Sequence, residues 1–248
     1  MQVIFDLIES MAQERRGRTF IAMDSVPGAD NRRICHVMAD AAGQQTIQGK
    51  VVANDGKRGG GCWIWHADVP QSMTKQSQWL FWPWTAEQMK GSSTALEGAN
   101  ANIGVAAACN HLPEMCTCAK VNCSSCKFMA KQVDVILHLD SLVWTRVATR
   151  IAARAEALAP LVVQLVDILK RNSAMLWIVY QSRDLGTIAD DISKSMMDAV
   201  NKEMRDRGCE QLGDKNRIRV ESMQEVRQAR EIAMQADARA PAVEESEP

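Results

Sequence analysis

Ile34-Cys35-His36-Val37-Met38 and Cys62-Trp63-Ile64-Trp65-His66 are two short apolar runs that decide the fold class of the first half of the chain. Both runs are rich in β-branched and aromatic residues, which favour strands. Asn54-Asp55-Gly56 lies between them and is a turn signal, and the glycine-rich stretch up to Gly61 is typical of a loop. The pattern predicts a small antiparallel sheet over about residues 18–68.

Beyond residue 128 the apolar residues recur at helical spacing. A first helix is predicted over residues 129–159, and Pro160 would end it. Leu161–Gln181 predicts a second helix, or a helix that becomes extended at Trp177-Ile178-Val179. Thr187 begins a third helix. The spacing therefore predicts a helical bundle in the C-terminal half.

The predicted fold class is α+β, with a small N-terminal antiparallel β-rich region, a cysteine-rich zinc knuckle and a C-terminal helical bundle. The proposed divisions are residues 1–108 for the β-rich region, 109–128 for the knuckle, 129–237 for the bundle and 238–248 for a disordered tail. The tail is rich in Ala, Pro and Glu, a composition that buries little apolar surface.

Residues 109–126 contain five of the eight cysteines and one of the four histidines of the chain. Zinc prefers four thiolate or imidazole ligands in a tetrahedron, and Cys123 with Cys126 forms the typical C-x2-C pair. The other two ligands would come from four nearby candidates. The complete candidate set is Cys109, His111, Cys116, Cys118, Cys123 and Cys126. The sequence thus predicts a bound zinc ion.

Two alternatives to zinc remain open for this run. The spacing from Cys118 to Cys126 is C-x4-C-x2-C, as at an iron–sulfur cluster, and the cysteines could also be ordinary thiols. A zinc deaminase would show His-x-Glu paired with Pro-Cys-x-x-Cys, but Leu112 and Pro113 follow His111 and Asn122 precedes Cys123. A structural rather than a catalytic metal is therefore predicted.

Basic residues follow the cysteine run and suggest a nucleic-acid contact. Arg146, Arg150 and Arg154 have the spacing of one helix face. Lys120, Lys127 and Lys131 lie just upstream. These side chains would suit a phosphate backbone, although a solvated helix face explains them equally well.

Overall composition excludes little. The formal net charge is -1, hydrophobic residues make up 46% and charged residues 24% of the chain. The strongest apolar stretch, Leu161–Tyr180, is interrupted by Asp167, Lys170, Arg171 and Asn172, so no membrane contact is predicted. The first eleven residues lack a basic segment typical of a signal peptide, which favours a cytoplasmic location.

No Walker A loop, G-x-G-x-x-G or G-x-S-x-G motif is present. The function predicted from sequence is a non-enzymatic, zinc-stabilised subunit of a nucleoprotein assembly, with nucleic acid and protein partners. One alternative is a scaffold protein that binds partners through its helices and a Trp/Met-rich surface. The other is a metal-dependent or redox enzyme.

Overall fold

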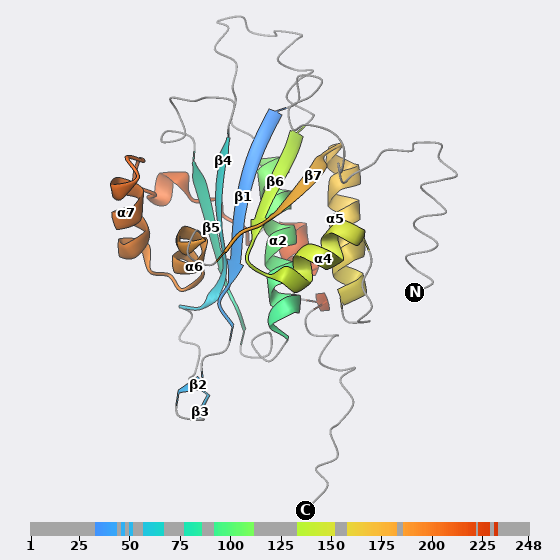
Figure 1. The fold of residues 1–248 in the computed structure, drawn as a ribbon, viewed down its shortest axis with the longest axis horizontal. Coiled ribbons are helices and arrows are strands. Elements are labelled where there is room, and N and C mark those ends of the chain that lie inside the picture. The colour runs from blue at the N-terminus through green and yellow to red at the C-terminus, as the bar shows by residue number, and fades with distance from the viewer. Residues whose placement is uncertain are drawn as a thin grey trace, which may run out of the picture.

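The computed structural model shows a five-stranded sheet in the order β5-β4-β1-β6-β7, with helices on both faces (Figure 1). Two short strands, β2 (Thr46–Ile47) and β3 (Lys50–Val51), pair with each other outside this sheet. The structure describes residues 33–43, 46–47, 50–51, 57–66, 77–85, 92–111, 133–151, 158–182, 186–221, 223–228 and 231–232.

The first half of the sheet is antiparallel, and within it the predicted antiparallel pairing is confirmed for β1 and β4. β1 (Arg33–Ala41) pairs with β4 (Gly59–His66), and β4 pairs with β5 (Gln78–Pro83). Val37 lies opposite Ile64, so the two apolar runs face each other across the ladder. Gly59, Gly60 and Gly61, which were predicted to lie in a loop, form the start of β4 instead. Neighbouring elements approach this part of the strand so closely that there is no room for a Cβ atom.

The second half of the sheet corrects the predicted C-terminal helical bundle. β6 (Val133–Leu139) runs parallel to β1, and β7 (Met175–Tyr180) runs parallel to β6. Helices separate and follow these strands, so the fold is mixed α/β. Strands in parallel sheets are often buried on both faces and give continuous apolar runs, which periodicity alone does not distinguish from a buried helix.

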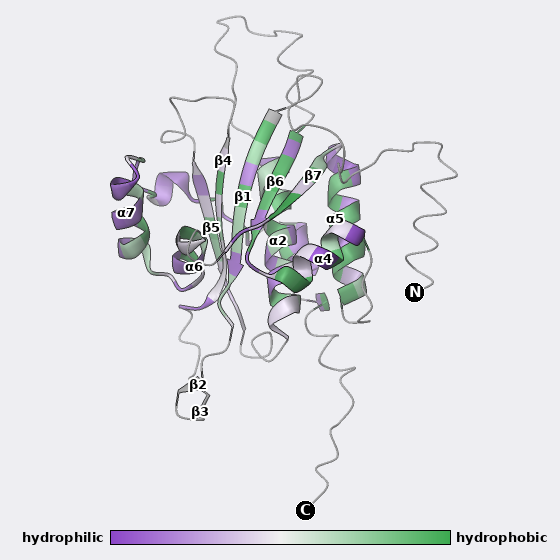
Figure 2. Cartoon of the chain, in the orientation of Figure 1, coloured by the Kyte–Doolittle hydropathy of each residue, from purple (hydrophilic) through white to green (hydrophobic). Residues whose placement is uncertain are grey.

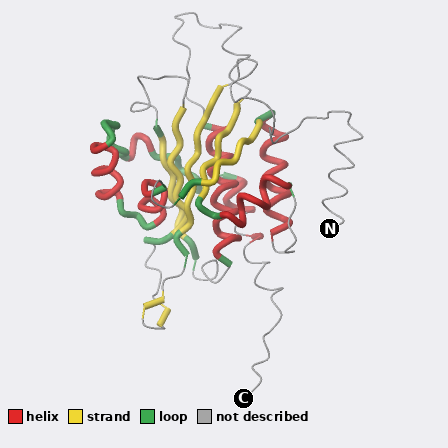
Figure 3. Tube along the Cα trace, viewed as in Figure 1, coloured by secondary structure: helices red, strands yellow, loops and turns green. Residues whose placement is uncertain are grey.

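Helices cover the sheet in two groups (Figures 1 and 3). One face carries α2 (Ser93–Asn110), α4 (Leu142–Arg150) and α5 (Ala159–Asn172). The opposite face carries α6 (Thr187–Ser193) and α7 (Met197–Asp206), followed by the short 3-10 turn η5 (Asp214–Asn216).

The two groups of helices bury different amounts of apolar surface. α2 begins at Ser92, whose hydroxyl accepts a hydrogen bond from the Ala95 amide, and its residues from Ala95 to Ala108 are mostly buried. α6 and α7 bury a smaller apolar cluster that includes Trp63 and Ile192. Figure 2 shows the contrast, with an apolar sheet centre and a largely hydrophilic α7. Among the described residues, no helix has the length and hydropathy of a membrane span.

Candidate active site

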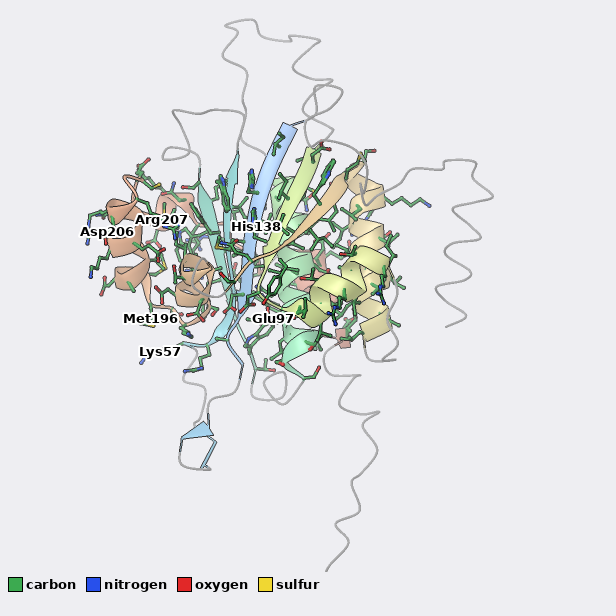
Figure 4. All side chains as sticks on the ribbon, in the orientation of Figure 1. Lys57, Glu97, His138, Met196, Asp206 and Arg207 are labelled. Atoms are coloured by element: carbon green, nitrogen blue, oxygen red, sulfur yellow. The ribbon has the colours of Figure 1, made fainter. Side chains whose placement is uncertain are left out.

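Three carboxylates meet at the edge of the sheet where β1 and β6 end. Asp40 is the penultimate residue of β1, Asp140 directly follows β6, and Glu97 lies in the second turn of α2. Because β1 and β6 are parallel neighbours, their carboxyl ends reach the same edge. One carboxylate oxygen from each residue lies within 4.8 Å of the others. Figure 4 labels Glu97 at this lower end of the sheet.

A cleft of about 590 Å³ opens at these carboxylates. Its walls come from the ends of β1 and β6, from α2 and from α6, and they carry both acidic and basic side chains. Polar and charged lining residues are Asp40, Arg58, Glu97, His138, Asp140, Gln181, Thr187, Asp190 and Lys194. The cleft therefore offers a concave, charged surface of the size of a small-molecule or polymer-segment site.

Asp40 lies in surroundings that make its carboxyl group a weaker acid. Burial first, and then the neighbouring Asp190 and Asp140 carboxylates, raise its pKa to about 6. The hydroxyl of Ser193 and the ammonium of Lys194 act in the opposite direction. A buried carboxyl beside other acids is a common feature of functional sites, because a bound cation or proton compensates its charge there.

α6 brings a fourth carboxylate and a cation to the cleft. Lys194 Nζ lies 2.6 Å from Asp190 Oδ2, one helical turn away, and both side chains are partly exposed. The Asp190 carboxylate is thus paired with a lysine, whereas Asp40, Glu97 and Asp140 group together.

Two histidines line the strands that lead to the cleft. His36 on β1 and His138 on β6 face each other, with His36 Nδ1 2.9 Å from His138 Nε2. His36 also stacks on Trp65, with ring centroids 4.8 Å apart. Burial, and then the neighbouring His36, lower the pKa of His138 to about 4. His138 is therefore neutral at pH 7 and adds no positive charge to the cleft.

The donor set of the cleft suits a hard divalent cation. Carboxylate oxygens are the ligands that Mg²⁺ and Mn²⁺ favour, whereas zinc and iron–sulfur sites favour thiolates and imidazoles. The spacing of the three oxygens within 4.8 Å is compatible with one shared ion. Asp40, Glu97 and Asp140 are the residues that would hold it.

The structure describes only two members of the predicted zinc set. Cys109 lies near the end of α2 and packs against the larger apolar cluster, and burial raises the pKa of its thiol to about 12. His111 caps the same helix and is exposed. Cys116, Cys118, Cys123 and Cys126 lie outside the described residues. Zinc at this run stays a prediction.

The structure also describes only two of the residues that were predicted to contact nucleic acid. Arg146 and Arg150 are exposed on α4, which begins two residues after Asp140. Lys120, Lys127, Lys131 and Arg154 lie outside the described residues.

Sequence reasoning missed the three carboxylates of the cleft. Asp40 and Asp140 each follow an apolar run, and an acid at the end of a buried strand is the signal that was available. The signal is weak without the strand order, because β6 was predicted to be helical and no local motif links Glu97 to either aspartate.

Comparisons with known proteins identify solved structures but no family. No protein-family model matches the sequence, and no curated protein matches it. Among solved structures, LC11-RNase H1 in complex with an RNA/DNA hybrid is 14% identical, with a TM-score of 0.37, over 65% of this chain and 93% of that one.

Two further solved structures are similar in the same range. RNase H1 from the halophilic archaeon Halobacterium salinarum NRC-1 is 12% identical, with a TM-score of 0.38, over 68% of this chain and 98% of that one. The N-terminal RNase H domain of rv2228c from Mycobacterium tuberculosis, fused to maltose-binding protein, is 17% identical, with a TM-score of 0.35, over 69% of this chain and 98% of that one.

These findings correct the predicted function. The prediction of a non-enzymatic subunit is contradicted: the solved structures that the comparison finds are RNase H proteins, while zinc at the cysteine run remains untested. The described residues also gather a carboxylate cluster at a cleft, which that prediction did not include.

Proposed function

We propose that this protein is a divalent-cation-dependent nuclease that hydrolyses phosphodiester bonds at the cleft between β1, β6, α2 and α6. The observation that carries the proposal is the convergence of Asp40, Glu97 and Asp140 within 4.8 Å at the carboxyl ends of two parallel strands. Ligands of α/β sheets commonly bind outside this end of the strands.

The three carboxylates would hold Mg²⁺ or Mn²⁺. When bound, such an ion supplies positive charge at the phosphate and lowers the pKa of water. The protein groups would orient the substrate around it. Arg58 and Lys194 line the cleft and are suited to contact phosphate oxygens, and the neutral His138 adds no charge there.

A nucleic acid is the substrate class that this surface favours. Arg146 and Arg150 are exposed on α4, one helical turn apart, and this helix starts beside Asp140. Guanidinium groups in such a row suit the regular phosphates of a nucleic-acid strand. The RNA/DNA hybrid bound by LC11-RNase H1 is therefore the first substrate to test, beside single-stranded RNA and duplex DNA.

The test is a cleavage assay with labelled hybrid, in Mg²⁺ or Mn²⁺ and in excess EDTA. We expect cleavage that requires the cation and falls by about 100-fold or more in Asp140→Asn and Glu97→Gln, because each change removes a charged oxygen ligand. Cleavage that continues in EDTA would contradict the proposal.

Asp206→Asn is the matched control for these variants. Asp206 is exposed at the end of α7, far from Glu97 in Figure 4. The substitution makes the same chemical change as Asp140→Asn and should leave cleavage unchanged. Equal losses in both variants would show that the cleft carboxylates have no special role.

A further inference from the structure

Asp40 is held from both faces of the sheet by groups that do not themselves belong to the carboxylate cluster. Asn100 approaches from α2 and Ser193 from α6, and both side chains are buried. Figure 1 shows these two helices on opposite sides of β1 and β4. The two contacts fix different parts of Asp40.

On the α2 face, Asn100 holds the main chain of Asp40. Its Nδ2 donates to the Asp40 carbonyl at 2.7 Å and to the Gly61 carbonyl at 3.0 Å. Its Oδ1 accepts a hydrogen bond from Trp82 Nε1 at 3.1 Å. Asn100 lies three residues after Glu97, so one helix face positions Glu97 and the Asp40 backbone together.

On the α6 face, Ser193 holds the side chain of Asp40. The Ser193 hydroxyl lies 2.7 Å from Asp40 Oδ2 and donates to it, and it also lies 2.7 Å from the main-chain oxygen of Asp190. A hydrogen bond to one carboxylate oxygen restricts rotation of the group. The other oxygen, Oδ1, then keeps a fixed direction.

Two glycines make this double approach possible. A Cβ at Gly60 would lie 2.2 Å from Asn100 Oδ1, and a Cβ at Gly61 would lie 2.4 Å from the Ser193 amide nitrogen. Successive strand residues face opposite sides of a sheet, so Gly60 admits α2 and Gly61 admits α6. Gly61 is also the residue paired with Asp40 across the ladder.

We propose that Asn100 and Ser193 are positioning residues that clamp Asp40 from the two faces of the sheet, so that its carboxylate is oriented for the divalent cation. This inference rests on the proposed function, because it assigns to the clamp the task of preparing a cation ligand. Groups that orient a metal ligand typically change metal affinity by about 10- to 100-fold when removed.

The experiment measures Mn²⁺ binding to the purified full chain by isothermal titration calorimetry, without substrate. Ser193→Ala should bind Mn²⁺ about tenfold more weakly while its circular dichroism and cooperative unfolding remain those of the folded protein. Ser193→Thr keeps the hydroxyl and should restore most of the affinity. Ser195→Ala, at an exposed position two residues away, is the matched control.

A second variant keeps the proposal testable if the first variant does not fold. If Ser193→Ala unfolds, Ser193→Cys keeps the side-chain volume and replaces a strong donor by a weak one, so it should weaken Mn²⁺ binding in the same direction. Folded Ser193 variants that bind Mn²⁺ as tightly as the wild type overturn the clamp and leave the proposed function intact. A wild-type chain that binds no Mn²⁺ overturns both.

Discussion

The two sides of Asp40 are built differently. α2 is an 18-residue, alanine-rich helix that is buried along most of its length in the larger apolar cluster. α6 has seven residues, packs in the smaller cluster with α7 and supplies the partly exposed Asp190–Lys194 pair. We infer from this difference in burial that the wall of the cleft that carries Glu97 is more rigid, and that the α6 wall has lower local stability.

The largest expected change in stability follows from a substitution on α2, the wall of the cleft that carries Glu97. Asn100→Ala leaves the buried Asp40 and Gly61 carbonyls and Trp82 Nε1 without this partner, which should lower the free energy of unfolding by about 3 kcal/mol. Chemical denaturation measures this loss. A cost below about 1 kcal/mol would show that α2 is not the more rigid wall.

Asn201→Ala is the matched change on the other side of the sheet. Asn201 on α7 also hydrogen bonds to backbone, donating to the Leu212 carbonyl at 3.2 Å and accepting from its amide at 2.8 Å. This pair ties down a single loop residue, so the expected cost is about 1 kcal/mol. Equal costs at the two asparagines would remove the distinction between the walls.

The next expected effect is on how the stability of the cation-free protein depends on pH. The folded-state pKa of Asp40 is about 6, above its ordinary value of 3.8, so the folded state binds this proton more tightly than the unfolded state. The resulting stabilisation is present below pH 4 and is lost as the pH rises through 6. Asp40→Asn should therefore raise the free energy of unfolding at pH 7 by about 1–2 kcal/mol, after allowance for partial solvent screening.

This gain should vanish as the pH falls to 4, because the wild-type carboxyl is then protonated as well. Thermal unfolding in EDTA at pH 4, 5, 6 and 7 measures it. His138 titrates in the same window with the opposite sign, since its lowered pKa removes stability as the pH falls from 6.5 to 4. The difference between wild type and Asp40→Asn isolates the Asp40 part, and a constant difference across these pH values would contradict the assignment.

The smallest effect is expected at Lys194. The pair with Asp190 is 35% and 43% exposed at its two side chains, so Lys194→Ala should change the free energy of unfolding by less than about 0.5 kcal/mol. Mn²⁺ affinity should rise slightly, because a positive charge leaves the neighbourhood of the carboxylates. Calorimetry and thermal unfolding measure both quantities, and weaker Mn²⁺ binding would show that Lys194 supports the cation site.

The antiparallel half of the sheet was easier to predict from the sequence than the parallel half. The antiparallel pairing of β1 with β4 was predictable because a turn signal separates two short β-branched and aromatic runs. β6 was not, because Val133-Asp134-Val135-Ile136-Leu137-His138-Leu139 is buried almost throughout and shows no clean alternation. The run was therefore assigned to a helix, and β7 appeared only as an alternative at Trp177.

The candidate site was not predictable for a related reason. Asp40, Glu97 and Asp140 come from a strand end, a helix and another strand end, and only the parallel pairing of β1 with β6 brings the two aspartates together. The dense cysteine run offered a local signal, whereas the carboxylates offered none within any short window. Gly60 and Gly61 were interpreted as loop residues, because a close approach from two faces is a property of packing.

The pairing of β1 with β6 also has a consequence for the order of folding. His36 and His138, which hydrogen bond across these strands, are 102 residues apart in sequence, whereas β4 and β5 are consecutive strands of the same sheet. Closing the longer loop carries the greater entropic cost, and distant contacts slow folding. We therefore expect the β1-β4-β5 meander to form first. In this early state Asp40 would already be part of the sheet, whereas Asp140 would not yet have reached it. Any ability to bind a cation would then appear only in the last stage of folding, when the parallel strands dock.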